Sequence, residues 1–334
     1  MANNLPIVTT SSRSLMKHCP QAWWWRYVDG YQAKGDDSPD ALWFGIGVHI
    51  ALAEWYQLGT KRGPHPADTF EKWVNGEIRY IRAAMAERDA EWYDEPKYED
   101  AAELGIAMLE GYVEKWGRDD QWEIIAIERP FKVRITSGGQ TIARFWSTWD
   151  GVFRDRSDGE IYLLENKTAS QIDTAYLELD DQAGSYFSVA SSILRADGTL
   201  KPGQVISGIQ YNFLRKSMPD DRPVNALGES LNKDGSVSKK QPAAAFVRPD
   251  PVLRSPGEVR SQMLQLQDET RIAVGMMNGE IPVTKTPTKM CPRTCDFFDM
   301  CILHNRGGDA WKTLARSTFV KKDPFARYRK SAGQ

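Results

Sequence analysis

The feature that most constrains the fold is a block of β-rich sequence in the middle of the chain. Its segments are rich in β-branched and aromatic residues, which favour extended backbone. Gly138-Gly139 and Ser157-Asp158-Gly159 supply the glycines that tight hairpin turns require. Successive strands are therefore predicted at 122–127, 131–136, 141–153 and 160–166.

Predicted helices lie on both sides of this block. Ser11 and Ser12 are plausible caps of a first helix that continues through the tryptophans at 23–25 and ends near Gly30. Downstream of the block, 205–214 is predicted as one more strand. The remaining predicted helices span 42–58, 68–92, 99–116, 179–194 and 259–279. This order predicts an α/β core with a helical N-terminal elaboration.

The chain is long enough for one large core, because it has 334 residues of which 41% are hydrophobic. We expect one composite domain with a helical part at 1–120, a core at 121–217 and a helix with clustered cysteines at 252–310. Between them, 218–251 is rich in Pro, Asp, Asn, Ser, Gly and Lys, which predicts a polar insertion or mobile loop. A basic tail at 311–334 follows.

The charge balance excludes a global positive field. There are 43 basic and 45 acidic residues, so any contact with nucleic acid must be local. The tail interleaves Phe319, Phe325 and Tyr328 with basic residues and has one acid, Asp323. It is either a nucleic-acid contact or a solvated tail. Its basic residues are Lys312, Arg316, Lys321, Lys322, Arg327, Arg329 and Lys330.

An acid on one predicted strand precedes an acid-x-lysine triplet on the next. Side chains two apart on a strand share a face, so Glu165 and Lys167 project together while Asn166 points away. If Asp150 lies on the neighbouring strand, two carboxylates form a hard oxygen site for Mg²⁺ or Mn²⁺ with a positive charge beside it. The simpler alternative is that Asp150 is a turn residue and the other two are an exposed charge pair.

Asp150 with Glu165-Asn166-Lys167 resembles the signature of the PD-(D/E)xK nucleases, whose restriction-endonuclease-like core is a central mixed sheet flanked by helices. Two further motifs are similar to those of the RecB-like branch. One is Gly45-x-x-x-His49, and the other is Gln182-x-x-x-Tyr186, whose spacing places both residues on one helix face. Glu128 fits the acid that this family has before its core hairpin.

The resemblance implies roles for these residues. His49, Asp150 and Glu165 would bind Mg²⁺ or Mn²⁺, with the backbone carbonyl of Asn166 as a further ligand. Asp150, Glu165 and Lys167 would be the catalytic residues, with Lys167 as the catalytic cation. Gln182 and Tyr186 would position the substrate. Trp23–Trp25 and Trp149 are candidate stacking surfaces for bases.

The four cysteines are Cys19, Cys291, Cys295 and Cys301. The longest apolar runs are too short to cross a bilayer and Met1–Thr10 does not resemble a signal peptide, so we expect a cytoplasmic protein without membrane contact. In such a chain four cysteines indicate metal binding or redox use rather than disulfides. Their distribution resembles the 4Fe-4S staple of RecB-like nucleases, although the first C-terminal gap is longer than usual. Structural Zn²⁺ is the alternative.

The function that the resemblance implies is that of a metal-dependent DNA exonuclease acting on DNA ends or single strands. It is similar to CRISPR-associated iron-sulfur exonucleases and helicase-linked nuclease domains. DNA repair, phage recombination and CRISPR-type processing are all compatible settings, with partner proteins of such complexes. The alternatives are a catalytically weak DNA-binding scaffold on the same fold and a sequence-specific endonuclease.

Overall fold

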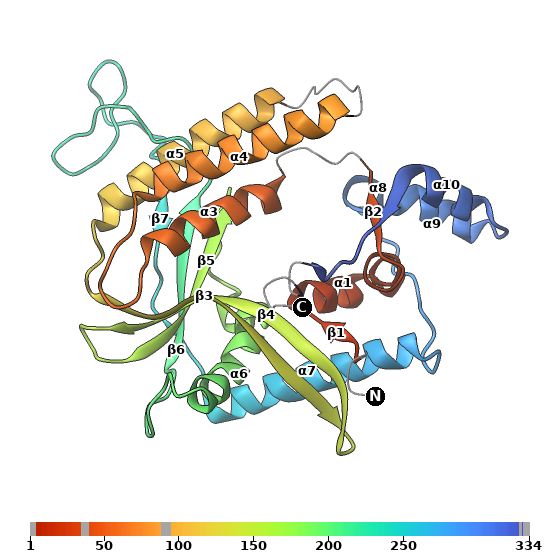
Figure 1. Ribbon diagram of the computed structural model, residues 1–334. Coiled ribbons are helices and arrows are strands. Elements are labelled where there is room, and N and C mark those ends of the chain that lie inside the picture. The colour runs from red at the N-terminus through yellow and green to blue at the C-terminus, as the bar shows by residue number, and fades with distance from the viewer. Residues whose placement is uncertain (1–4, 35–39, 88–94, 327–328, 330–334) are drawn as a thin grey trace.

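The computed structural model describes residues 5–34, 40–87, 95–326 and 329. In these residues a mixed sheet of seven strands forms the centre of the protein, and helices lie on both of its faces (Figure 1). The strand order is β1-β4-β5-β6-β7, with β3 beside β4 and β8 beside β6. This architecture confirms the predicted α/β fold with a central mixed sheet flanked by helices.

The long strands coincide with the predicted β-rich block. They pair antiparallel from β3 through β5, whereas β5 and β6 run parallel. The segments 122–127 and 131–136 form one strand rather than two, because the ladder to β4 continues past Glu128 and Pro130. The strands are β1 Ile7–Val8, β3 Trp122–Ser137, β4 Gln140–Asp155, β5 Ile161–Ala169, β6 Gly208–Arg215, β7 Phe246–Val247 and β8 Val252–Leu253.

Three helices cover one face of this sheet. They are α3 Ala41–Trp55, α4 Pro66–Glu87 and α5 Glu95–Trp116. Leu52, Phe70 and Leu109, one from each helix, are fully buried in a common core with Leu164 of β5. A methyl group on Gly47 would lie 2.2 Å from the Trp73 ring, so α3 and α4 pack closely at this glycine. The end of the predicted helix 68–92, from residue 88, lies outside the described residues.

Two other helices cover the opposite face. They are α6 Asp181–Ala196, which connects the parallel strands β5 and β6, and α7 Pro256–Met277. Leu163 faces this side, whereas its neighbour Leu164 faces α3 to α5, as strand alternation requires. A short 3-10 turn, Leu177–Leu179, precedes α6. A capping box between Ser255 and Glu258 begins α7 slightly earlier than predicted.

The predicted first helix is interrupted at Cys19. Pro20 has no N–H and disfavours helical backbone at the residue before it, so Cys19 is extended, with φ −156° and ψ 105°. It separates α1 Thr10–His18 from α2 Pro20–Trp23, and a π-helical turn, Trp24–Val28, follows. The prediction of one continuous helix is therefore wrong, and the break places Cys19 at a helix junction.

The early and late segments of the chain lie side by side. Figure 1 shows the red N-terminal segment against the blue C-terminal one, where β2 Tyr31–Ala33 pairs antiparallel with β9 Phe319–Lys321. Trp25 and Phe297 share a buried cluster with Phe319. The late helices are short, namely α8 Cys291–Thr294, α9 Phe298–Asn305 and α10 Ala310–Thr318. None of the described helices is long and apolar enough to cross a membrane.

The predicted basic tail is folded where the structure describes it. Phe319 and Phe325 are buried, and Lys312 and Arg329 form ion pairs with Asp309 and Asp323. Three members of the predicted basic and aromatic set lie outside the described residues, namely Arg327, Tyr328 and Lys330.

The polar segment 218–251 forms a loop that extends beyond the sheet (Figure 1, teal). It has internal order, because the isolated bridges Val224↔Ser230 and Leu231↔Val237 close two successive turns. Arg222 donates to Asp220 and to the Ser238 hydroxyl across this loop. Its end returns to the sheet as β7, which pairs with β6.

A buried arginine, Arg13, joins α1 to α6 and α7. Arg13 is 1% exposed and donates to Glu269 of α7 at 2.8 Å, to Ser185 of α6 at 2.7 Å and to Asp181 of α6 at 3.0 Å. Burial raises the pKa of Asp181, but Arg13 and Lys17 outweigh it and lower that pKa overall. The ionised network therefore fixes α1, which leads directly to Cys19.

We expect Arg13→Met to lower the free energy of unfolding by about 3 kcal/mol, because it leaves one buried and one partly buried carboxylate, Glu269 and Asp181, with too little positive charge. Urea denaturation measures the loss. The control is Arg271→Met, which removes an exposed pair with Asp268 on α7 and should leave the midpoint nearly unchanged. Equal losses in the two variants would contradict a structural role for the Arg13 network.

Candidate active site

The candidate site lies where β4 and β5 separate. Their antiparallel ladder extends from Arg154↔Ile161 to Gly151↔Leu164 and ends there. Immediately beyond, Asp150 Oδ2 accepts the backbone N–H of Asn166 at 2.7 Å. A side chain thus replaces the missing strand partner of β5. This bond holds one oxygen of the carboxylate, while the other turns toward α3.

Three elements bring potential metal ligands together beside this carboxylate. His49 Nδ1 of α3 lies 3.3 Å from Asp150 Oδ1 and 3.4 Å from Glu128 Oε1 of β3. These ligand atoms all lie within 4.8 Å of one another, and no other group of three His, Cys, Asp or Glu residues in the described parts of the chain does so. Burial disfavours charge on His49, but Asp150 and Glu128 outweigh it and raise its pKa well above the usual value.

Glu128 reaches this group through an unusual backbone conformation. Its φ is 39°, in the left-handed region that residues with a side chain rarely adopt. The neighbouring pairs Ile127↔Gly151 and Arg129↔Trp149 place it opposite Asp150 across the ladder. Such strain costs roughly 1–2 kcal/mol and is typical of functional sites.

Glu165 and Lys167 project together from β5, as strand alternation predicts. Lys167 Nζ lies 2.7 Å from Glu165 Oε1 and 3.7 Å from Asp180 Oδ2. Burial raises the pKa of Glu165 to about 7, although Lys167 lowers it. Burial disfavours charge on Lys167, but Glu165 and Asp180 outweigh it and raise its pKa, so the ammonium remains protonated.

The two α6 motif residues have different surroundings. Lys167 Nζ donates to Gln182 Oε1 at 3.3 Å, so Gln182 lies at the site. Tyr186 is 5% exposed, and its hydroxyl accepts a hydrogen bond from Ser147 Oγ of β4 at 2.7 Å. Tyr186 therefore fixes α6 against β4 from within the core.

The donors at this site suit a divalent cation. Carboxylate oxygens and an imidazole nitrogen are ligands that Mn²⁺ accepts, and Mg²⁺ prefers the oxygens. Glu165 Oε2 is also buried without a hydrogen-bond partner, so a cation beside it would satisfy an atom that the protein leaves unpaired. The residues therefore fit a Mg²⁺ or Mn²⁺ site. The carbonyl of Asn166 stays a predicted further ligand.

The predicted base-stacking role of three tryptophans is wrong. Trp23 and Trp25 are each 2% exposed and Trp149 is 1% exposed, so none of them offers an open ring face. Trp149 instead stacks on Phe131, with ring centroids 4.6 Å apart. The apolar area of these rings stabilises the core and is not available to bases.

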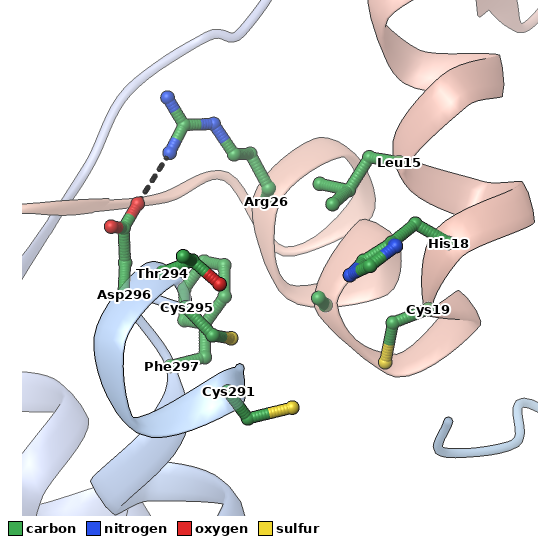
Figure 2. A pocket seen from close by; sticks show the side chains of 10 residues that line it. Leu15, His18, Cys19, Arg26, Cys291, Thr294, Cys295, Asp296 and Phe297 are labelled. Carbon is green, nitrogen blue, oxygen red and sulfur yellow. Dashed lines mark hydrogen bonds and ion pairs between the residues drawn. The ribbon is translucent and has the colours of Figure 1, made fainter. Parts of the chain in front are cut away.

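The cysteines form a second candidate site between the two ends of the chain. All four are free thiols. Cys19, Cys291 and Cys295 line a cavity of about 200 Å³. Figure 2 shows Cys19 on the α1 side and, across from it, Cys291 of α8 and Cys295, the residue that follows α8. Cys301 of α9 packs in the same cluster as Cys19 and Cys295.

The environment of these thiols is compatible with metal binding. The backbone N–H of Thr288 donates to Cys291 Sγ at 3.2 Å and lowers the pKa of that thiol. Burial raises the pKa of Cys295 and of Cys301, and the charges of Cys19 and Cys291 add to this effect. A metal would favour the thiolate of each one. Thiols are the ligand type of an iron-sulfur cluster and of structural Zn²⁺, although no three of these sulfur atoms lie within 4.8 Å of one another.

Two acidic residues, Glu128 and Asp180, lie closer to the candidate site than the sequence around them indicates. Glu128 lies with His49 and Asp150, although its motif is only one acid before a hairpin. Asp180 caps α6, accepting the Gln182 N–H at 2.9 Å, and its other oxygen faces Lys167. The predicted helix 179–194 includes Asp180, whereas α6 begins one residue after it, and neither position indicates a neighbouring lysine from a strand.

Glu128→Gly should separate binding from stability. Glycine adopts positive φ readily, so we expect the free energy of unfolding to stay constant or rise by up to about 1 kcal/mol. Mn²⁺ affinity should fall by more than about tenfold, as measured by calorimetry. The control, Glu123→Gly on the regular part of β3, should lose stability and keep Mn²⁺ affinity. Unchanged Mn²⁺ affinity in Glu128→Gly would contradict a ligand role for this carboxylate.

Comparison with known proteins agrees with this geometry. The family model described as the PD-(D/E)XK nuclease superfamily matches residues 8–302, a range that includes the ligand group, Lys167 and all four cysteines. No curated protein matches the chain in a sequence search. The members of the matching family are mostly nucleases that use divalent metals. Since the match extends over most of the sequence, the chain belongs to the PD-(D/E)XK nuclease superfamily.

Proposed function

We propose that this protein is a DNA exonuclease of the RecB-like branch that requires Mg²⁺ or Mn²⁺. The observation that carries the proposal is the position of the His49, Glu128 and Asp150 group beside the Glu165–Lys167 pair. Both lie at the point where β4 and β5 separate. A charged lysine next to a cluster of hard metal ligands is the arrangement that phosphodiester hydrolysis needs.

His49, Glu128 and Asp150 would hold the cation, and Glu165 would contact it through its unpaired Oε2. When bound, a divalent cation polarises a phosphate oxygen and favours deprotonation of an attacking water. Asp150 needs no rearrangement for this role, because the Asn166 N–H already fixes its second oxygen. Such preorganisation is what makes electrostatic catalysis effective.

Lys167 would stabilise the negative charge that builds on the phosphate. Its ammonium lies between Glu165, Gln182 and Asp180, so its position is restricted before substrate arrives. Gln182 would help to orient the DNA strand at the same place. Tyr186 would contribute indirectly, because its bond to Ser147 holds α6 and therefore Gln182 in position.

The intact Lys167 and its assembled neighbours favour an enzyme over a catalytically weak scaffold. A sequence-specific endonuclease stays the second alternative, and the extended loop 218–251 is the segment that would serve recognition. The formal net charge of −2 means that DNA would be held locally, at the site and at short basic segments. Recombination, repair and CRISPR-type processing are all compatible with an exonuclease.

We also propose that the four cysteines bind a 4Fe-4S cluster. The cavity that Cys19, Cys291 and Cys295 line has about 200 Å³, far more than one metal ion fills. Their spacing, with Cys19 remote and the others grouped, differs from the paired knuckles that structural Zn²⁺ usually takes. The cluster would join α1 to α8 and α9.

The nuclease proposal predicts Mn²⁺-dependent degradation of linear DNA and little cutting of circles. Incubation with linear and circular DNA, single- and double-stranded and end-labelled, measures both. We expect Lys167→Ala to lower the rate by roughly 10²–10³, as is typical when one group that stabilises a transition state is lost. Lys72→Ala, on the exposed side of α4, is the matched control and should retain activity.

The outcomes of this experiment distinguish the alternatives. Equal cutting of circular and linear DNA would favour the endonuclease. The scaffold alternative would be supported if the wild type bound DNA and degraded none of it in Mn²⁺ or Mg²⁺.

The cluster proposal predicts iron, acid-labile sulfide and visible absorption in anaerobically purified protein. Cys19→Ala should lose the iron and become more sensitive to protease at both ends of the chain. Thr294→Ala, which changes the lining of the same cavity without removing a thiol, should retain iron. Stoichiometric zinc without iron would favour the Zn²⁺ alternative, and unchanged iron in Cys19→Ala would exclude that residue as a ligand.

A further inference from the structure

A buried polar network lies behind the candidate site, on the opposite face of β5. Asn166 is 3% exposed, and its side chain points away from Glu165 and Lys167. Its Oδ1 accepts a hydrogen bond from Asn212 Nδ2 of β6 at 2.8 Å, across the registered pair Asn166↔Asn212. Asn212 Oδ1 in turn accepts from Arg248 Nε at 3.1 Å. The network therefore connects the middle of the acid-x-lysine triplet to a buried arginine.

Arg248 is itself held rigidly. Its guanidinium carbon lies 4.0 Å from the centroid of the Trp116 ring and 3.8 Å from that of Trp122. Two of its nitrogens donate to Asp119, at 3.0 and 2.6 Å. This bidentate ion pair and the two aromatic faces leave the guanidinium one orientation.

The network contains further buried polar groups. It also includes Tyr112, whose hydroxyl accepts from Asn212 at 3.0 Å and from Arg248 at 2.7 Å. Asp119 has a positive φ of 54°, so backbone strain is stored here as well as at Glu128. The surrounding core is apolar, and replacing a buried ion pair in such a core by apolar side chains often leaves the free energy of unfolding unchanged or raises it. Stability alone therefore does not explain the buried pair of Arg248 and Asp119. A buried polar network with several shared hydrogen bonds favours one geometry.

The geometry that it specifies is that of Asn166. On one face the side chain of Asn166 is held by Asn212, and along the sheet its backbone N–H is bonded to Asp150 Oδ2 at 2.7 Å. Because the ladder between β4 and β5 has already ended, this single bond joins the two strands at the site. A shift of Asn166 would move the carboxylate of Asp150 relative to His49.

We propose that Asn212 and Arg248 are positioning residues for the metal site, acting through Asn166 on Asp150. The inference rests on the proposed function in taking Asp150 as a metal ligand. Neither residue would contact the cation. Outer partners of this kind typically change metal affinity by 10- to 100-fold when they are lost.

Calorimetric titration of the full chain with Mn²⁺, without DNA, tests the proposal. Asn212→Leu removes all three side-chain hydrogen bonds of Asn212 while keeping a branched side chain, and it should weaken Mn²⁺ binding by about 10- to 100-fold. Asn212→Asp keeps an acceptor for Arg248 and lets the Asn166 amide turn to donate, so it should bind Mn²⁺ nearly as the wild type does. Val74→Ala, a buried truncation in α4, should lose stability and keep Mn²⁺ affinity.

Arg248→Lys is the second variant if Asn212→Leu does not fold. It keeps a positive charge beside Asp119 and removes the N–H that Asn212 accepts, so Mn²⁺ binding should weaken by a smaller factor. Wild-type Mn²⁺ affinity in a folded Asn212→Leu or Arg248→Lys overturns the inference. A wild type that binds Mn²⁺ and cuts no DNA overturns the nuclease function alone, because the relay to Asp150 is measured by binding.

Discussion

The hydrogen bond from the Asn166 N–H to Asp150 is the contact on which the candidate site depends. Two antiparallel strands that stayed paired would have no room for ligands between them. Here the ladder stops, and a carboxylate takes the place of the next backbone acceptor. This one hydrogen bond thus joins the strands where their ladder ends, and it also orients a potential metal ligand. The strained backbone of Glu128 lies on β3, which pairs with β4, and brings a second carboxylate close to Asp150 and His49.

Much of the fold and part of the site could be predicted from sequence because they depend on local patterns. The long strands, α3 to α7 and the shared face of Glu165 and Lys167 follow from apolar spacing and strand alternation. The position of Glu128 beside His49 and Asp150 could not be predicted as firmly, because no sequence pattern indicates a positive φ at a residue with a side chain. Pro20 is a sequence signal for the helix break at Cys19, because proline disfavours helical backbone at the residue before it. The tryptophans that follow Pro20 fit a helical pattern and indicate the opposite.

The buried network behind the site had no signal in the sequence at all. Asn212 lies in an apolar strand and Arg248 at the end of a polar loop, so each has an ordinary local explanation. The part of Asn212 and Arg248 in the network depends on contacts between residues that are far apart in the chain, such as Arg248 with Asp119. Tertiary register decides such pairs, and local propensity carries no information about it. The burial of Trp23, Trp25 and Trp149 likewise depends on the distant neighbours of each ring.

The joining of early and late segments has a consequence for how the protein forms on the ribosome. Trp25 and Phe297, which pack with centroids 5.6 Å apart, are separated by about 270 residues of sequence. At roughly 5–20 residues per second, the second ring is synthesised some tens of seconds after the first. During that interval the central sheet can assemble, but the cysteine-lined cavity does not yet exist. Any metal that the four cysteines bind would therefore enter after synthesis of the core, as one of the last steps of maturation.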